Sequence, residues 1–218
     1  LRARLEEVAE IRWPAVEMVR ESRDGTVKFL LALADGERVE CVLIPERDHY
    51  TACLSTQVGC AMGCGFCATG MLGFRRNMTP GEMLGQVLVG RQYLADKGVE
   101  LGLRNLVFMG MGEPLLNYEN LLKTLEALHH PQGLDFSGRR ITVSTAGVAR
   151  HLLDLGRTGL CSLAISLHAP TQAQRERIMP GAAKLELDKL VDVLAQYPLK
   201  SRERLTFEYL LLAGVNDA

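Results

Sequence analysis

The sequence predicts an α/β fold: a partial (β/α) barrel that is incomplete at its C-terminal end and is preceded by a helical segment and a β-hairpin. From about residue 53 onward, short apolar strand-like runs alternate with helical stretches. Polar or glycine-rich sequence follows the end of nearly every run. In a barrel these carboxyl ends meet on one face, so several segments can line a single site. A doubly wound sheet, which would concentrate its ligand at one switch point, is the alternative.

The first fifty residues precede this alternation. Residues 1–22 carry apolar side chains at helical spacing, with Pro14 restarting the pattern, and they predict a helix. Within residues 23–50, two strand-like runs flank Asp35-Gly36, a dipeptide typical of a tight hairpin turn. The expected organisation is therefore a helical segment at 1–22, a connecting β-hairpin at 23–50 and a core at 51–218.

The core is expected to contain five strands separated by helices. The first helix has the clearest start, because Thr79 offers an N-cap, Pro80 suits the first helical position and Glu82 completes a capping box. Strands that alternate with helices pair in parallel through right-handed crossovers. The chain stops after the fifth strand, before a barrel could close, which predicts a fragment. The strand candidates are 53–57, 104–109, 139–144, 160–167 and 205–212, and the helix candidates lie near 80–96, 117–129, 147–155 and 185–196.

Composition excludes several classes of protein. The formal net charge of -1 gives no global field for nucleic acid, although a local basic patch remains compatible with it. No run approaches the roughly 18 apolar residues of a membrane span, and the charged first residues are unlike a signal peptide. A cytoplasmic protein with no membrane partner is expected. Candidate phosphate contacts, each of which could equally be a solvated face, are Arg75, Arg76, Arg139, Arg140, Arg175 and Arg177.

Three of the six cysteines crowd into one short loop. Cys60, Cys64 and Cys67 fall within eight residues, in a chain without secretory features. A structural zinc site usually draws four ligands from two separated pairs, and no second pair occurs here. Thiolates at this close spacing are typical of iron-sulfur clusters, and three of them leave one iron of a [4Fe-4S] cube open to a small ligand. The alternatives are thioredoxin-like chemistry and three small buried hydrophobes.

The cysteine spacing, with Phe66 before the last cysteine, resembles the signature of radical S-adenosylmethionine (SAM) enzymes. The surrounding sequence is similar to the RlmN family, the dual-specificity adenine-C2 methyltransferases of ribosomal and transfer RNA. The similarity runs in order across nearly the whole chain. The segments that carry it are CLSTQVGC at 53–60, MGMGEP at 109–114, STAG at 144–147 and SLHAP at 166–170.

This resemblance implies a radical SAM-type partial barrel with two cofactors, a [4Fe-4S] cluster and SAM. Cys60, Cys64 and Cys67 would hold the cluster, and its open iron would be chelated by the amino and carboxylate groups of SAM. Gly112-Glu113 would receive the SAM amino group. The resemblance adds Ser144, Ser166, Leu167 and His168 as further SAM contacts, with Leu167 acting through its backbone. Taken singly, a serine at a strand end is more often a turn or cap residue.

The resemblance also implies a route for methyl transfer to C2 of an adenosine in 23S ribosomal RNA and in transfer RNA. A cysteine near the family's C-terminus is first methylated and then forms a covalent RNA intermediate. Cys53 would resolve that adduct through a transient disulfide, and Glu40 would accept a proton. No cysteine follows Cys161, so the methyl-carrying residue is missing from these 218 residues. SAM binding without complete methyl transfer is expected, with flavodoxin or ferredoxin as electron donor.

Other functions compete with this prediction. A sister family, which methylates adenine C8 and confers antibiotic resistance, shares the cluster and both cysteines. A methylthiotransferase would need cysteines for a second cluster, which the chain lacks. A catalytically incomplete, metal-stabilised RNA-binding module agrees with the missing cysteine, but it would not require Cys53, Glu113, Ser144 and His168 together. Residues 1–22 would be the remnant of an N-terminal RNA-binding accessory region.

Overall fold

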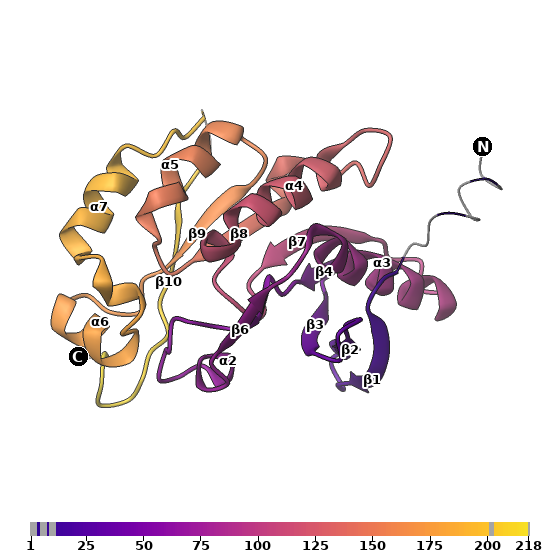
Figure 1. The fold of residues 1–218 in the computed structure, drawn as a ribbon, viewed down its shortest axis with the longest axis horizontal. Helices are drawn as coiled ribbons and strands as arrows, with labels where there is room; N and C mark the ends of the chain where they lie inside the picture. Colours follow the sequence, from indigo (N-terminus) through magenta and orange to yellow (C-terminus); the bar gives the residue numbers. More distant parts are fainter. Residues whose placement is uncertain (1–3, 5–7, 9–11, 201–202, 218) are drawn as a thin grey trace.

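The computed structural model describes residues 4, 8, 12–200 and 203–217. Within them, one eight-stranded sheet has the order β1-β2-β3-β4-β7-β8-β9-β10, and a separate two-stranded sheet joins β5 to β6. Figure 1 shows the large sheet curving from β1 at one end to β10 at the other, with α4, α5 and α7 along its outer side. From β4 onward the strands follow one another in sequence order, so the sheet has no switch point and has the predicted barrel type.

The first four strands of the large sheet are antiparallel to one another. They are β1 (Ala15–Glu21), β2 (Val27–Ala32), β3 (Arg38–Pro45) and β4 (Tyr50–Cys53). The hairpin expected around Asp35-Gly36 is confirmed, with Ala32 opposite Arg38 across the turn. It is extended on both sides by a further strand.

The helix expected over residues 1–22 is wrong for its second half. Ala15–Glu21 is a strand that pairs with β2 from Ala15 opposite Ala32 to Glu21 opposite Val27. Helical spacing of apolar residues over so short a run is a weak signal, and pairing with the open edge of β2 overrides it. Residues 1–3, 5–7 and 9–11, which carry much of the rest of that prediction, lie outside the described residues.

The remaining strands of the large sheet are parallel, as predicted. They are β7 (Leu103–Phe108), β8 (Ile141–Thr145), β9 (Ser162–Ser166) and β10 (Thr206–Glu208), which continue from β4. The strand expected at 53–57 is misplaced. The pairing of β4 with β7 ends at Cys53. Beyond it, the buried side-chain amide of Gln86 takes the place of a neighbouring strand, because it bonds both the backbone N–H (2.8 Å) and the carbonyl (2.8 Å) of Ser55. The chain then turns away into β5 (Gln57–Gly59) and pairs with β6 (Phe74–Asn77).

The four expected helices are α3 (Pro80–Asp96), α4 (Tyr118–His129), α5 (Ala149–Thr158) and α7 (Leu187–Ala195). The capping box at the start of α3 is confirmed, since Thr79 and Glu82 each bond the other's backbone N–H. Two short helices were not expected: α2 (Ala68–Met71) and α6 (Gln172–Ile178). Single 3-10 turns occur at η1 (Pro114–Asn117), η2 (Gly138–Arg140) and η3 (Ala182–Lys184). None of the described helices is long and apolar enough to cross a membrane.

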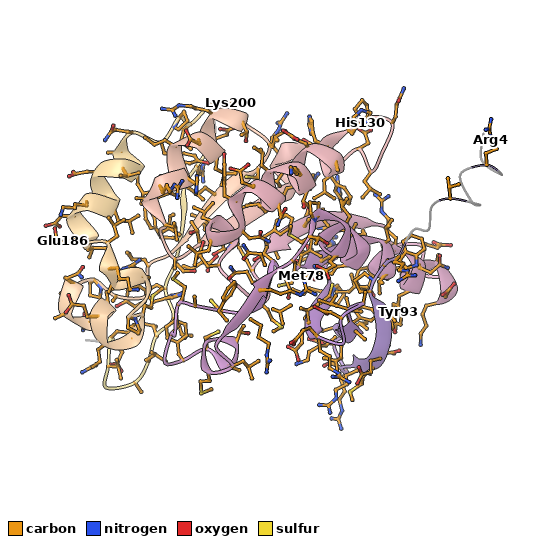
Figure 2. All side chains as sticks on the ribbon, viewed as in Figure 1. Arg4, Met78, Tyr93, His130, Glu186 and Lys200 are labelled. Carbon is orange, nitrogen blue, oxygen red and sulfur yellow. The ribbon has the colours of Figure 1, made fainter. Side chains whose placement is uncertain are left out.

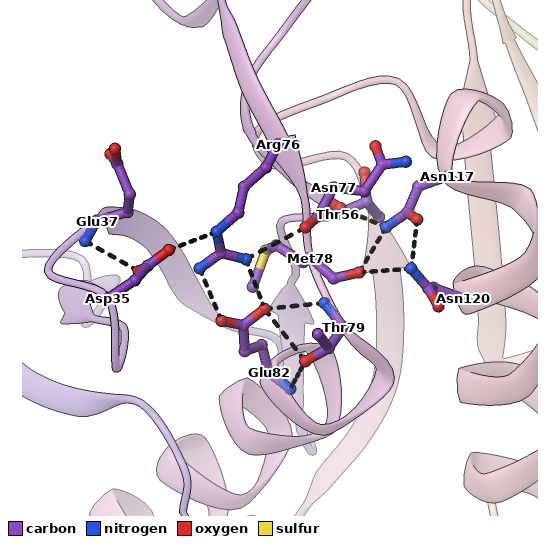
Figure 3. Close-up of polar contacts among 10 residues, drawn as sticks. All are labelled: Asp35, Glu37, Thr56, Arg76, Asn77, Met78, Thr79, Glu82, Asn117 and Asn120. Carbon is purple, nitrogen blue, oxygen red and sulfur yellow. Dashed lines mark hydrogen bonds and ion pairs between the residues drawn. The ribbon is translucent and has the colours of Figure 1, made fainter.

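Polar contacts fasten β6 to its neighbours, as Figure 3 shows. Arg76 forms ion pairs with Asp35 of the β2–β3 turn (2.6 Å) and with Glu82 of α3 (2.9 Å). The amide of Asn117 donates to the backbone carbonyls of Thr56 and Met78, each at 2.8 Å. These contacts fix the β5–β6 pair, at the start of β5 and the end of β6, against the β2–β3 turn, α3 and η1.

Two groups of buried apolar side chains hold the fold together. The larger lies between the sheet and its helices, and Met78, fully buried, is seen among its side chains in Figure 2. The smaller, which we call the loop cluster, joins the segment around Cys60 to the start of α5 and the end of α6. Its buried members are Cys60, Met62, Ala146, Ala169, Ile178, Met179 and Ala182.

Candidate functional site

A cavity of about 210 Å³ opens at the carboxyl ends of the parallel strands. It is lined by the loop after β5, by the segments that follow β7, β8 and β9, and by β10 itself. Residues far apart in sequence thus share one wall, as expected when parallel strands end together. The sequence-predicted residues among its lining are Cys60, Cys64, Cys67, Gly112, Glu113, Ser144, Ser166 and His168.

The cysteine-bearing loop begins directly after β5 and returns through α2 to β6. The pairing of β5 with β6 closes its base, where Cys60 donates its backbone N–H to the carbonyl of Gly73 (2.9 Å). Gly59 has a positive φ of 73°, and a Cβ there would lie 1.8 Å from that carbonyl oxygen. Only glycine allows the two chain segments to approach so closely.

The three thiols of this loop face the same cavity, and none is in a disulfide. Burial raises the pKa of the Cys60 thiol and raises that of Cys64 to about 11. Within the described residues, no three His, Cys, Asp or Glu side chains converge closely enough to hold one metal ion. Thiolates that bind an iron-sulfur cube each take a different iron, so they surround a larger group. The donor set therefore fits a cluster better than tetrahedral zinc.

The carboxylate of Glu113 is nearly inaccessible, with 3% of the residue exposed. It accepts hydrogen bonds from the hydroxyl of Thr145 (2.6 Å) and from the backbone N–H groups of Ala146 (2.8 Å) and Leu115 (3.0 Å). Burial raises the pKa of Glu113, and these three donors offset part of that rise. The site thus holds an oriented carboxylate that gains stability if a cationic group approaches it.

Gly112 brings Glu113 into position. Its φ is +100°, and a Cβ would lie 2.5 Å from the Cβ of Gln57. The side chain of Gln57 accepts from the backbone N–H of Glu113 (2.8 Å) and donates to Asn77 of β6 (2.7 Å). Gln57 was not predicted as a site residue. Its only signal in the sequence is its place within the CLSTQVGC segment, between Thr56 and Val58.

A chain of hydroxyl and carboxyl groups joins the ends of three strands. The Ser144 and Ser166 hydroxyl oxygens lie 3.2 Å apart, and the Ser166 hydroxyl donates to Oε2 of Glu208 (3.0 Å). The Oε1 atom of Glu208 is buried with no hydrogen-bond partner in the described part of the chain. Sequence analysis missed Glu208, although an acidic residue inside an otherwise apolar strand candidate was a usable signal.

His168 adopts a left-handed backbone conformation, with φ of 52°. The backbone N–H of Leu210 donates to its Nδ1 (3.1 Å), so this nitrogen is an acceptor and Nε2 carries the proton. Burial lowers the pKa of His168 and favours the neutral ring. The ring packs edge-on against Phe66, with centroids 5.1 Å apart. Asn216, also missed from sequence, holds the segment in place by donating to the His168 carbonyl (2.6 Å).

Three predicted site residues are not part of the cavity lining. Leu167 contributes its backbone, whose N–H donates to the carbonyl of Glu208 (3.1 Å). Cys53, the last residue of β4, is half-buried, and burial raises its pKa to about 11 with a further rise from nearby Glu208. Glu40 of β3 forms an ion pair with Lys28 of β2 (2.6 Å), on a surface where both side chains are about half exposed.

The arginines considered as phosphate contacts differ in their exposure to solvent. Arg75, Arg139 and Arg177 are exposed, whereas Arg76 is held in the ion pairs described above. Arg175 is completely buried, so neither alternative left open for it, a phosphate contact or a solvated face, applies. It lies on the inward face of α6, a helix that the sequence analysis did not expect.

Comparisons with known proteins agree with this geometry. The model of the radical SAM superfamily matches residues 54–218. A curated protein from Solidesulfovibrio magneticus named dual-specificity RNA methyltransferase RlmN is 96% identical over the whole chain. A protein of the same name from Nitratidesulfovibrio vulgaris (strain DP4) is 60% identical over 99% of the chain. The chain spans 62% and 61% of the length of these two relatives.

The fold is also similar to that of a solved structure. The crystal structure of a radical SAM methyltransferase from Sphaerobacter thermophilus superposes with a TM-score of 0.93 at 40% sequence identity. The match covers 100% of this chain and 64% of that one.

Proposed function

Since this chain belongs to the radical SAM superfamily, we propose that it is the cofactor-binding core of an RNA methyltransferase acting at C2 of adenosine in 23S ribosomal RNA and in transfer RNA. The observation that carries the proposal is the shared cavity of three free thiols, a buried carboxylate and strand-end hydroxyls. The names of the relatives support RNA as the substrate, and the resemblance to the RlmN family supports C2 as the methylated atom. The superfamily implies a [4Fe-4S] cluster and SAM as cofactors.

Cys60, Cys64 and Cys67 are assigned to hold the cluster. When bound, the cluster supplies the electron that cleaves SAM and so starts the radical chemistry. The protein's part is to hold the three thiolates and to exclude water. Burial raises the pKa of Cys60 and Cys64, so cluster binding would have to displace their protons, and the bound metal would then keep the thiolates deprotonated.

Glu113 is assigned to the amino group of SAM. Its carboxylate is preoriented by Thr145, Ala146 and Leu115, and it is buried where an ammonium interaction is strong. The opposite charge would favour the ionised form of Glu113 and so offset the burial that raises its pKa.

Ser144, Ser166 and His168 are assigned to orient the rest of SAM, with Leu167 contributing its backbone. The hydroxyl pair at 3.2 Å and the neutral imidazole offer directed donors and acceptors along one wall of the cavity. Phe66, packed edge-on against His168, contributes apolar surface to the same cavity. This wall would hold the cleavable bond of SAM in a defined orientation.

For the RNA half of the reaction, Cys53 is assigned to release the RNA from its covalent adduct, and Glu40 to accept a proton. Cys53 lies near Glu208, which lines the cavity, and Glu40 is half exposed to an approaching substrate. The methyl-carrying cysteine of the reaction is not among these 218 residues. The proposal further includes a cytoplasmic setting and flavodoxin or ferredoxin as the electron donor.

The experiment that tests the proposal is anaerobic reconstitution of the chain, followed by iron and sulfide analysis and by EPR of the reduced protein with and without SAM. We expect a cube-type cluster whose EPR signal changes on addition of SAM. Cys64→Ala should abolish that change, whereas Cys161→Ala, which alters a cysteine outside the cavity, should not. Stoichiometric zinc, or a cluster indifferent to SAM, would contradict the proposal. Mass analysis of RNA treated with a full-length relative then distinguishes C2 from C8 methylation.

A further inference from the structure

Arg175 is a charged side chain with no surface exposure. Its guanidinium donates to the carbonyl of Leu167 at the end of β9 (3.0 Å) and to the carbonyl of Ala146 at the end of β8. Its Nε atom has no acceptor, and no carboxylate of the described residues forms an ion pair with it. A buried cation without a counter-ion is costly, and arginine does not escape the cost by losing its proton.

The surroundings of Arg175 point toward the cysteine loop. Ile178, one turn further along α6, accepts the backbone N–H of Gly65 within that loop (2.9 Å). Just beyond α6, Gly181 donates to the carbonyl of Met62 in the same loop (2.9 Å). Ile178 and Met62 pack in the loop cluster, which also contacts Cys64. Burial lowers the pKa of Arg175, and the neighbouring Cys64 opposes that shift.

The guanidinium thus lies beside the strand ends that line the cavity, and the helix that carries it is bonded to the loop on which the proposed function puts three thiolates. A cube-type cluster held by three thiolates carries net negative charge, and reduction increases that charge. A nearby cation, in surroundings that exclude water, stabilises the reduced form more than the oxidised form.

We propose that Arg175 is a positioning residue that supplies the buried counter-charge of the cluster-loaded cysteine loop and thereby makes the cluster easier to reduce. The inference rests on the proposed function. The reduction adds one electron to the cluster from an external one-electron donor, flavodoxin or ferredoxin in the cell and dithionite in the experiment. No bond is made or broken at Arg175, and its proton stays in place.

The test is an EPR-monitored redox titration of reconstituted wild type, Arg175→Gln and Arg175→Lys. Glutamine keeps a hydrogen-bond donor but removes the charge, whereas lysine keeps the charge but loses the forked geometry. For Arg175→Gln we expect at least a tenfold weaker reduction equilibrium, a shift of about 59 mV to more negative potential for a one-electron couple. Arg175→Lys should lie between Arg175→Gln and wild type. The matched control is Arg177→Gln, an exposed arginine on the same helix, which should leave the potential unchanged.

A second measurement applies if a variant assembles too little cluster for the redox titration. The difference in melting temperature between the loaded and apo forms measures how strongly the loaded loop is stabilised. If Arg175 is its counter-charge, this difference shrinks in Arg175→Gln and is largely restored in Arg175→Lys. The inference would be overturned if Arg175→Gln had the same reduction potential and the same difference in melting temperature as wild type. It would also be overturned if Arg175→Gln and Arg175→Lys changed these two quantities equally. A wild-type chain that forms no SAM-responsive cluster would instead contradict the proposed function.

Discussion

At Gly112 the backbone conformation and the available space both exclude a side chain. Its φ of +100° is unfavourable for other residues, and the nearest side chain would be 2.5 Å from a new Cβ. Gly112→Ala should therefore displace Glu113 and weaken SAM binding about tenfold or more, since misplacing a buried charge-assisted contact costs about 1.5–3 kcal/mol. Isothermal titration of the reconstituted protein with SAM measures the effect.

Gly36→Ala is the matched control for that change. Gly36 also has a positive φ, 85°, but a Cβ there would meet nothing within 4 Å. It should lower stability by about 1–2 kcal/mol through backbone strain alone and leave SAM affinity unaltered. If both alanine variants bind SAM as wild type does, close approach at Gly112 does not control the site.

Glu113 gives the apo protein a pH dependence with a definite sign. Burial raises its folded-state pKa above the ordinary value of 4.5, so the folded protein binds this proton more tightly than the unfolded chain. The resulting stability is fully present below pH 4.5 and is lost as pH rises through the raised pKa.

Relative to Glu113→Gln, apo wild type should therefore lose stability as the pH rises above 4.5 and through the raised pKa of Glu113. Urea unfolding of both proteins across that range provides the measurement. The comparison cancels the surface carboxylates whose pKa values are lowered, such as Asp35 and Asp48, because both proteins share them. A constant difference in unfolding free energy would contradict the raised pKa.

The predicted site residues that share the cavity are those for which a motif coincides with a strand end. Cys60, Glu113 and Ser166 belong to short motifs that directly follow or close a strand, and the cavity gathers them. Glu208 and Arg175 were missed as site residues because their importance comes from burial and from partners more than 25 residues away, such as Ser166 and Ala146. The sequence marks Glu208 only as an acidic residue within an apolar run, and it does not show the distant partners of either residue.

Among the elements, α3 starts with the most complete set of local signals. Thr79 caps the helix, and Glu82 bonds back to the cap while holding Arg76. Thr79→Ala should lower the free energy of unfolding by about 1 kcal/mol, the usual loss for a helix cap. Urea denaturation followed by circular dichroism gives this value. Gln92→Ala, at an exposed position of the same helix, is the control and should be nearly neutral; equal losses would show that the cap is not the cause.

The predicted element boundaries agree with the structure where adjacent residues encode them, as a helix cap does. The range 80–96 matches α3 exactly because its cap is encoded by adjacent residues. The run at 15–21 became a strand because β2 offered an unpaired edge, a partner that periodicity cannot reveal. The strand expected at 205–212 ends at Glu208, since Asn216 binds the following segment through Leu210 and Leu212.

On the scale of the whole molecule, the loop cluster ties cofactor binding to stability. It buries Cys60 and Met62 against Ile178 and Met179, so the cysteine loop and the end of α6 form one packed unit. Removing iron with a chelator and an oxidant should lower the melting temperature by several degrees, as loss of a ligand bound only by the folded state does. Differential scanning calorimetry of loaded and stripped protein measures it.

The control for that experiment is Cys64→Ala, which should melt alike before and after iron removal. Wild type that melts at one temperature in both states would show that the loop is equally stable without its cluster.

The strand β4 belongs to both halves of the large sheet, since it pairs antiparallel with β3 and parallel with β7. The N-terminal strands therefore share a hydrogen-bond ladder with the strands that end at the cavity. Amide hydrogen exchange should show β3 and β7 opening together, with similar protection, as members of one cooperative unit. A substitution that weakens the pairing of the N-terminal strands would then also lower the protection of the strands that end at the cofactor site, because all of them share one hydrogen-bonded sheet.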